Sequence, residues 1–175
     1  DGSPVCVYFI MGRSENSRNR VFEETEDGIR TRAFDEAKMK DPSLIIYHPV
    51  RHVPGALIVT NGDQTDTIRD FLEKGGNVYN ALATRRFEPD APNWTPRVSG
   101  LLFPGGEYFL SILKADGAED PGCERFYYAY SEPRAGEGRF ISTYEGFGSP
   151  LPSFSGEPVQ VAVPPLNACD LAERI

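Results

Sequence analysis

The chain has 175 residues, enough for a single domain with its own core, and its 39% hydrophobic and 25% charged residues are ordinary for a globular protein. A formal net charge of −8 argues against a general polyanion binder, so we expect no nucleic-acid partner. No apolar run approaches the roughly 20 residues of a membrane span, so we expect no membrane partner. Three widely spaced cysteines fit free thiols in a reducing cytoplasm.

Both ends of the chain have the pattern of interrupted elements. Asp1-Gly2 is a hairpin-turn dipeptide directly before an apolar segment, yet no first strand precedes it. Asn167 fits a helix cap, and the helical pattern after it stops after about two turns. We therefore expect one domain over residues 1–175, truncated at both ends.

The first third of the chain predicts strands and one arginine-rich loop. Residues 5–11 are apolar throughout, which predicts a strand buried on both faces. A polar loop over 12–19 follows, and residues 21–34 predict a hairpin around Asp27-Gly28. Residues 43–47 predict another buried strand, which pairs with 56–59 through a turn near Pro54-Gly55.

The rest of the chain predicts two helices and then a run of strands. The helices are expected over 65–74, ended by Gly75-Gly76, and over 78–86. Residues 87–96 predict irregular, proline-rich chain with the only tryptophan. A meander over 97–103, 108–114, 126–130 and 139–144 follows, and a further strand is expected at 159–163. This order predicts an α+β fold of antiparallel sheets with helices packed on one face.

Residues 59–68 join a strand to a helix through a row of small polar groups. Free backbone N–H groups and the helix dipole favour an anionic ligand at such a place. The alternative is an ordinary helix start, in which Thr65 or Asp66 caps the helix and Asp63 accepts hydrogen bonds in the turn. Spacing alone favours the cap.

Arg13, Arg18 and Arg20 form a cluster directly after the apolar segment 5–11. Arginine suits bidentate contact with phosphate, and a loop that follows a buried strand is held by a rigid support. A solvated loop with ordinary surface ion pairs is an equal alternative.

The two histidines, His48 and His52, do not predict a metal site. Pro49 excludes a helix there, and in a strand the pair would lie roughly 13 Å apart at about 3.3 Å per residue. Phosphate-binding loops, dinucleotide fingerprints and nucleophile elbows are also absent from the sequence. We therefore expect no metal and no cofactor.

Tyr47, Arg51 and Glu88 lie at predicted strand or loop ends and together could transfer protons and stabilise charge without a metal. The alternative for the tyrosine is core packing with a satisfied hydroxyl, which is commoner. Tyr144 and Glu145 have the same ambiguity. Spacing alone singles out none of these residues.

Taken in order, several segments resemble the archaeal-type IMP cyclohydrolase family over roughly residues 5 to 145. The matching pieces are Arg13-Ser14 through Asn19-Arg20, Tyr47 with Arg51, Val59-Thr60-Asn61-Gly62, Thr65-Asp66-Thr67-Ile68, Thr95-Pro96-Arg97 and Ile141-Ser142-Thr143-Tyr144-Glu145. The resemblance implies a four-layered αββα sandwich like that of Ntn hydrolases. It also implies ring closure of 5-formamidoimidazole-4-carboxamide ribonucleotide to IMP, with a small purine nucleotide as partner.

The resemblance also implies roles for individual residues. The family's active-site arginine falls on Arg18 or Arg20, its tyrosine on Tyr47 and its glutamate on Glu88. We therefore expect Tyr47, Glu88 and Arg20 to be catalytic, and we expect the substrate-binding residues to be Arg13, Arg18, Arg51, Asn61, Thr65, Asp66 and Arg97. The chain departs from the family pattern at His48-Pro49 and in the prolines between Glu88 and Thr95.

Two other function classes stay open on the sequence. One is a purine-nucleotide-binding relative with a different activity or none, which the departure at His48-Pro49 favours. The other is an Ntn-type amide hydrolase, which needs Cys6 as its first residue; inside an apolar segment, Cys6 more readily packs as a small hydrophobe. The sequence also leaves a homo-oligomer open.

Overall fold

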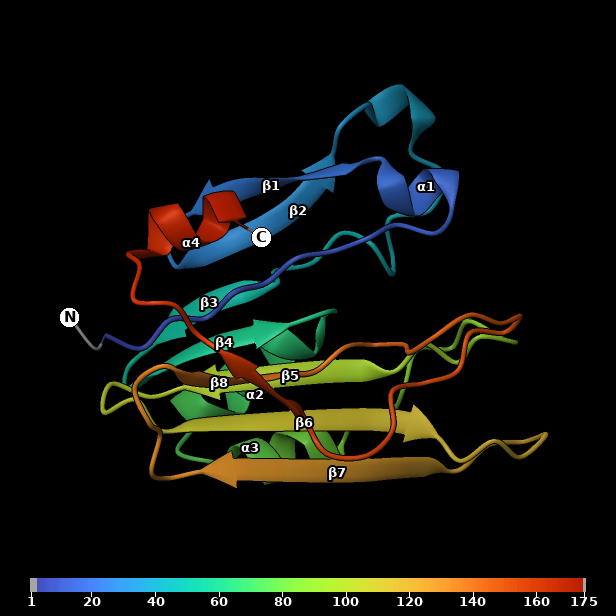
Figure 1. The fold of residues 1–175 in the computed structure, drawn as a ribbon. Helices are drawn as coiled ribbons and strands as arrows, with labels where there is room; N and C mark the ends of the chain where they lie inside the picture. Colours follow the sequence, from blue (N-terminus) through green and yellow to red (C-terminus); the bar gives the residue numbers. More distant parts are fainter. Residues whose placement is uncertain (1–2, 175) are drawn as a thin grey trace.

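A computed structural model describes residues 3–174 of the chain. Its main feature is a seven-stranded antiparallel sheet in which each strand lies beside the next one along the chain (Figure 1). The strands are β1 (Arg20–Thr25), β2 (Gly28–Ala33), β3 (Val50–Val53), β4 (Ala56–Thr60), β5 (Arg97–Leu102), β6 (Tyr108–Ala115) and β7 (Cys123–Tyr130). The hairpin at Asp27-Gly28, the turn at Pro54-Gly55 and the β5–β7 meander are confirmed.

Helices α2 (Gln64–Glu73) and α3 (Val78–Ala83) cover one face of this sheet, behind it in Figure 1. Their apolar sides bury Ile68 and Leu82 against sheet residues such as Ile58 and Leu101, which forms the core. Asn77 caps α3 by accepting a hydrogen bond from Asn80 N. The two predicted middle helices are therefore confirmed. Among the described helices, none is long and apolar enough to cross a membrane.

A two-stranded sheet lies on the opposite face. It pairs β8 (Glu137–Phe140) with β9 (Val159–Ala162), and Figure 1 shows it in front of the large sheet. The chain between these strands is tied to the large sheet, since Tyr128 Oη donates to Gly156 O at 2.9 Å and Lys114 Nζ donates to Phe154 O at 3.2 Å. Helix α4 (Ala168–Arg174) follows, capped by Asn167 as predicted.

The prediction of a doubly buried strand at residues 5–11 is wrong. This segment is extended but belongs to neither described sheet, and Val5, Val7, Phe9 and Met11 are exposed. Within this segment only Tyr8 and Ile10 are partly buried, and the Tyr8 hydroxyl hydrogen-bonds to that of Tyr47. Composition alone could not separate a one-sided apolar segment from a fully buried one. The Asp1-Gly2 turn lies outside the described residues.

Residues 43–47 do not form the predicted strand either. The backbone turns where Ile45 N and Ile46 N both donate to Pro42 O, and the Thr31 side chain then bonds to the backbone of Ile45 and Tyr47. Because a threonine side chain replaces the regular ladder, it is β3, and not 43–47, that pairs with β4.

The strand predicted at 139–144 is also shifted. β8 ends at Phe140, and it pairs with β9 and does not extend the meander beyond β7. The loop over 12–19 contains the single-turn helix α1 (Glu15–Arg18), and a short 3₁₀ helix, η1 (Glu36–Lys38), follows β2. The fold is α+β, with one large antiparallel sheet and few helices, as predicted at that level.

Candidate active site

The turn between β4 and α2 is held by its own small polar side chains. Thr60 Oγ1 donates to Gly62 O at 2.7 Å and lies 2.6 Å from Thr65 Oγ1, and Gly62 N donates back to Thr60 Oγ1. Thr60 and Thr65 are both fully buried. The two threonines thus fix the backbone that carries Asn61, Gly62 and Asp63.

There is little space for a side chain at Gly62, because the polar ends of three side chains converge on it. A Cβ at this position would lie 2.5 Å from Arg97 Nη1, 2.7 Å from Gln64 Oε1 and 3.2 Å from Glu88 Oε1. The Asn61-Gly62 pair, which by itself signals only a turn, is therefore where the backbone makes room for a buried polar network.

Asn61 joins three segments of that network. Its side-chain amide donates to Pro96 O at 2.8 Å and to Thr143 Oγ1 at 3.2 Å, while its Oδ1 accepts from Val98 N and Gln64 Nε2. With these four contacts, Asn61 holds the end of β4 against the start of β5.

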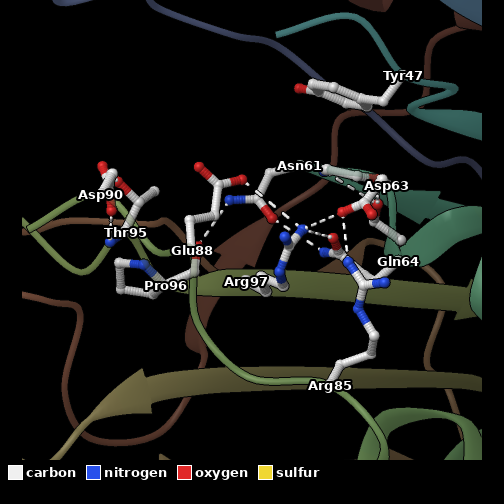
Figure 2. A network of polar contacts seen from close by, with 12 residues as sticks. Tyr47, Asn61, Asp63, Gln64, Arg85, Glu88, Asp90, Thr95, Pro96 and Arg97 are labelled. Atoms are coloured by element: carbon white, nitrogen blue, oxygen red, sulfur yellow. Dashed lines mark hydrogen bonds and ion pairs between the residues drawn. The ribbon is translucent and has the colours of Figure 1, made fainter. Parts of the chain in front are cut away.

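Arg97 is the buried cation at the centre of the network, 5% exposed (Figure 2). Its Nη1 lies 2.7 Å from Asp63 Oδ1, 2.7 Å from Gln64 Oε1 and 3.7 Å from Glu88 Oε1. Asp63 is also paired with Arg85, at the end of the α3 segment. Although burial acts to raise it, the hydrogen bonds and charges of Arg85 and Arg97 lower the pKa of Asp63.

Glu88 is the second carboxylate beside Arg97, yet it makes no hydrogen bond to it. Its backbone N donates to Thr95 O at 2.8 Å, which places the side chain over the start of β5. Glu88 is 6% exposed, and this burial raises its pKa to about 7 against the opposing charge of Arg97. A carboxyl in that range can take up or release a proton near neutral pH.

Tyr47 lies on the other side of the site. In Figure 2 its ring stands apart from the network, on the side toward which the Glu88 carboxylate points. Its hydroxyl is hydrogen-bonded to the Tyr8 hydroxyl at 2.9 Å, and the Arg20 guanidinium lies 6.0 Å from the Tyr47 ring centre. Burial raises the pKa of Tyr47, with the charge of Glu88 acting in the same direction, so its hydroxyl stays protonated.

Arg20, and not Arg18, faces this space. Arg20 lies within electrostatic reach of both Tyr47 and Glu88, and its buried Nε has no hydrogen-bond partner in the described part of the chain. Arg18 instead donates to the carbonyls of Gly12 and Arg13, which closes the α1 loop.

Arg13 fastens the rim of the site. It donates to Asn93 Oδ1 at 3.1 Å and to Tyr144 Oη at 2.9 Å, and its guanidinium lies 4.6 Å from the Tyr144 ring centre. Tyr144 is in turn 2.6 Å from Thr95 Oγ1, next to the carbonyl that anchors Glu88. Residues 131 positions apart in the chain thereby hold the Glu88 loop.

Arg51 and Asp66 form a separate ionic cluster. Arg51, on β3, pairs with Asp66 on α2 and with Asp27 in the β1–β2 turn, and its Nη2 lies 3.0 Å from His48 Nδ1. Two carboxylates therefore already neutralise this arginine. By contrast, within residues 3–174 no salt bridge joins an acidic side chain to Arg13, Arg18 or Arg20.

The interpretation of residues 63–66 as an ordinary helix cap is wrong. α2 begins at Gln64, so Thr65 and Asp66 lie inside its first turn, and the Asp63 side chain makes no capping hydrogen bond. Arg85 and Arg97 bind that carboxylate instead. The sequence-based site thus missed Asp63, Gln64 and Arg85, although the polar run after Asn61 had marked the first two as unusual.

The family model described as IMP cyclohydrolase-like protein matches residues 1–175. The chain belongs to this family. The resemblance stated from the sequence is thereby confirmed at the family level.

Several archaeal relatives carry the name IMP cyclohydrolase. The protein of Methanopyrus kandleri is 33% identical over 148 residues, which cover 82% of this chain and 69% of the relative. That of Methanosphaera stadtmanae is 29% identical over 143 residues, covering 79% and 65%. That of Halobacterium salinarum is 29% identical over 119 residues, covering 66% and 60%. The chain thus matches about two thirds of the length of these relatives.

Proposed function

We propose that the chain is an IMP cyclohydrolase, which closes 5-formamidoimidazole-4-carboxamide ribonucleotide to IMP with loss of water. Its family and the names of its archaeal relatives support this reaction. The observation that carries the proposal is the buried carboxyl of Glu88, ionisable near neutral pH, which faces a protonated tyrosine hydroxyl and an arginine.

The reaction requires that the two reacting groups of the substrate are held close together and that protons are moved to and from them. Both reacting groups belong to one molecule, so holding the carboxamide nitrogen against the formyl carbon removes much of the barrier. A C–N bond then forms while the formyl C=O electron pair moves to oxygen. That oxygen gains a proton, the attacking nitrogen loses one, and water departs with the proton of the former formamido nitrogen.

Each residue of the site is assigned one part of this reaction. Glu88 takes the proton of the attacking nitrogen, because its carboxylate is buried and lies 3.7 Å from Arg97, beyond hydrogen-bond distance. Tyr47 donates a hydrogen bond to the developing oxyanion, and the free Nε of Arg20 steadies the same charge. Arg97, Asn61 and Thr65 hold the Glu88 side of the site in place.

The phosphate is assigned to the arginines without acidic partners, Arg13 and Arg18, at the α1 loop. Arg51 and Asp66 neutralise each other and support the wall of the site. A hollow of about 610 Å³ beside α2 touches the network only at Asp63 and Arg85, away from Glu88 and Tyr47, and we do not assign the nucleotide to it.

The proposal extends to the four-layered αββα sandwich. Helices α2 and α3, the large sheet and the β8–β9 sheet would supply three layers, and α4 lies on the side of the fourth (Figure 1). The cytoplasmic location and a homo-oligomer stay predictions.

Ultraviolet absorbance with the formamido ribonucleotide at pH 8 tests the activity, with IMP as the expected product. Glu88→Gln is expected to lose about 10²- to 10⁴-fold in turnover, the usual contribution of a general base. Asp70 is a half-exposed carboxylate on α2 paired with Arg69, so Asp70→Asn is the matched control and is expected to turn over normally. Binding of IMP without any turnover would contradict the proposal and favour a nucleotide-binding relative.

A further inference from the structure

Asp63 stands out because it competes with Glu88 for one buried cation. Arg97 Nη1 is at hydrogen-bond distance from Asp63, 2.7 Å, but 3.7 Å from Glu88. Gln64 Oε1 takes a further 2.7 Å contact with the same nitrogen. The guanidinium is thus already occupied on the side that would otherwise reach Glu88.

We infer that Asp63 is a positioning residue: by holding Arg97 in a hydrogen-bonded ion pair, it keeps that cation from pairing fully with Glu88. The Glu88 carboxyl is thereby left able to take and release a proton in the neutral range. This inference rests on the proposed function only for its catalytic meaning. The competition for Arg97 is a property of the folded chain.

Burial is the main cause of the raised pKa of Glu88, and the surrounding charges, Asp63 among them, add to it or oppose it. Arg97 on β5 and Arg20 on β1 favour the carboxylate form of Glu88. Asp63, before α2, and Asp90, on the same loop as Glu88, disfavour it. The hydroxyls of Tyr8, Tyr47 and Tyr144 face it from the N-terminal segment, from the chain before β3 and from the chain after β8.

Removing the Asp63 charge has two effects on the ionisation of Glu88, and both act in the same direction. The repulsion between Asp63 and Glu88 disappears, and Arg97 is released toward Glu88. Both favour the carboxylate, so the pKa of Glu88 falls from about 7. Removing Arg85 acts the opposite way, because the charge of Asp63 is then less neutralised.

The test is a carboxyl-carbon NMR titration of the folded protein labelled with ¹³C in its glutamate side chains. Glu88→Gln identifies the signal, and we expect its midpoint near 7 in the unaltered chain. In Asp63→Asn the midpoint is expected to fall by roughly one pH unit or more, as for a carboxyl gaining a cationic partner. Asp70→Asn, on the same helix but paired with Arg69, leaves it unchanged.

A second variant protects the test against misfolding. Arg85→Gln changes the second arginine that pairs with Asp63 and leaves the Asp63–Arg97 pair itself unaltered, and the Glu88 midpoint is expected to rise. An unchanged midpoint in either folded variant would overturn the inference. Cyclisation is measured on the same samples: absent turnover with shifted midpoints refutes the proposed function alone, and turnover with fixed midpoints refutes the role of Asp63 alone.

Discussion

Two arginines flank the N-terminal end of α2, and each lies between two carboxylates. They differ in how many of these carboxylates they hydrogen-bond. Arg51 hydrogen-bonds to both of its partners, Asp27 and Asp66, whose side chains are about 40% exposed. Of its two carboxylates, Arg97 is at hydrogen-bond distance only from Asp63, and it leaves Glu88 buried at 3.7 Å. In the first arrangement both carboxylates are partly exposed and hydrogen-bonded to the arginine, whereas in the second one carboxylate is buried and not hydrogen-bonded to it.

The pKa directions follow that difference. Although burial acts to raise it, Arg51 lowers the pKa of Asp27, which therefore stays ionised. Burial raises the pKa of Glu88 to about 7, and Arg97 does not overcome it. An arginine between two carboxylates can thus be structural or can leave a carboxyl able to transfer a proton. The outcome depends on the burial of the carboxyl and on whether the arginine hydrogen-bonds to it.

The difference between the two clusters is tested most strongly by neutralising Glu88 and measuring the free energy of unfolding at different pH values. Because its folded pKa lies above the ordinary 4.5, its contribution to stability is full below about pH 4.5 and is lost as pH rises through 7. Glu88→Gln should therefore be more stable than the unaltered chain at pH 8.5, by about 3 kcal/mol at about 1.4 kcal/mol per pKa unit. Urea unfolding at pH 8.5 and at pH 5 measures this, and an equal gap at both values would contradict it.

Filling the space at Gly62 should disturb the Arg97 cluster alone. A methyl group there would lie 2.5 Å from Arg97 Nη1, so Gly62→Ala is expected to cost about 2 kcal/mol of unfolding free energy, as overpacking does. Gly100→Ala on β5 is the control, since its Cβ would meet its nearest neighbour at an ordinary 3.4 Å. Thermal unfolding compares them; equal losses would show that Gly62 has no special role.

A substitution in the Arg51 cluster should change the free energy of unfolding least. Asp27→Asn removes one of two carboxylates from a partly exposed pair, so we expect a loss of roughly 1 kcal/mol because solvent screens such charges. Asp27 has a pKa below its ordinary 3.8, so this loss is fully present above about pH 4 and vanishes as the pH falls below 3.8 through the lowered pKa of the folded chain. Urea unfolding at pH 7 and pH 3 measures it, and a loss larger than that of Gly62→Ala would reverse the proposed ranking.

The elements with local signals could be predicted from the sequence. Asp27-Gly28 and Pro54-Gly55 are turns by their own chemistry, and the apolar spacing around Ile68 and Leu82 predicts α2 and α3. Residues 43–47 failed because a distant side chain, Thr31, takes the place of a neighbouring strand. No local pattern encodes such a contact.

The candidate site was predicted through resemblance more than through spacing. Tyr47, Glu88 and Arg20 do lie near one another, while Arg51 and Asp66 belong to the neighbouring ionic cluster. Asp63 and Arg85 were missed because 22 residues separate them and their pairing appears only in the folded chain. Gly62 was taken for a turn residue, and only the packing of Arg97 and Glu88 shows its second role.

The pH dependence of cyclisation by the unaltered chain tests the central claim most directly. If Glu88 is the base, kcat/KM for the formamido ribonucleotide rises with pH through a midpoint near 7, and the residual activity of Glu88→Gln lacks this rise. A midpoint near the ordinary 4.5 of a glutamate, or the same rise in Glu88→Gln, would contradict the account.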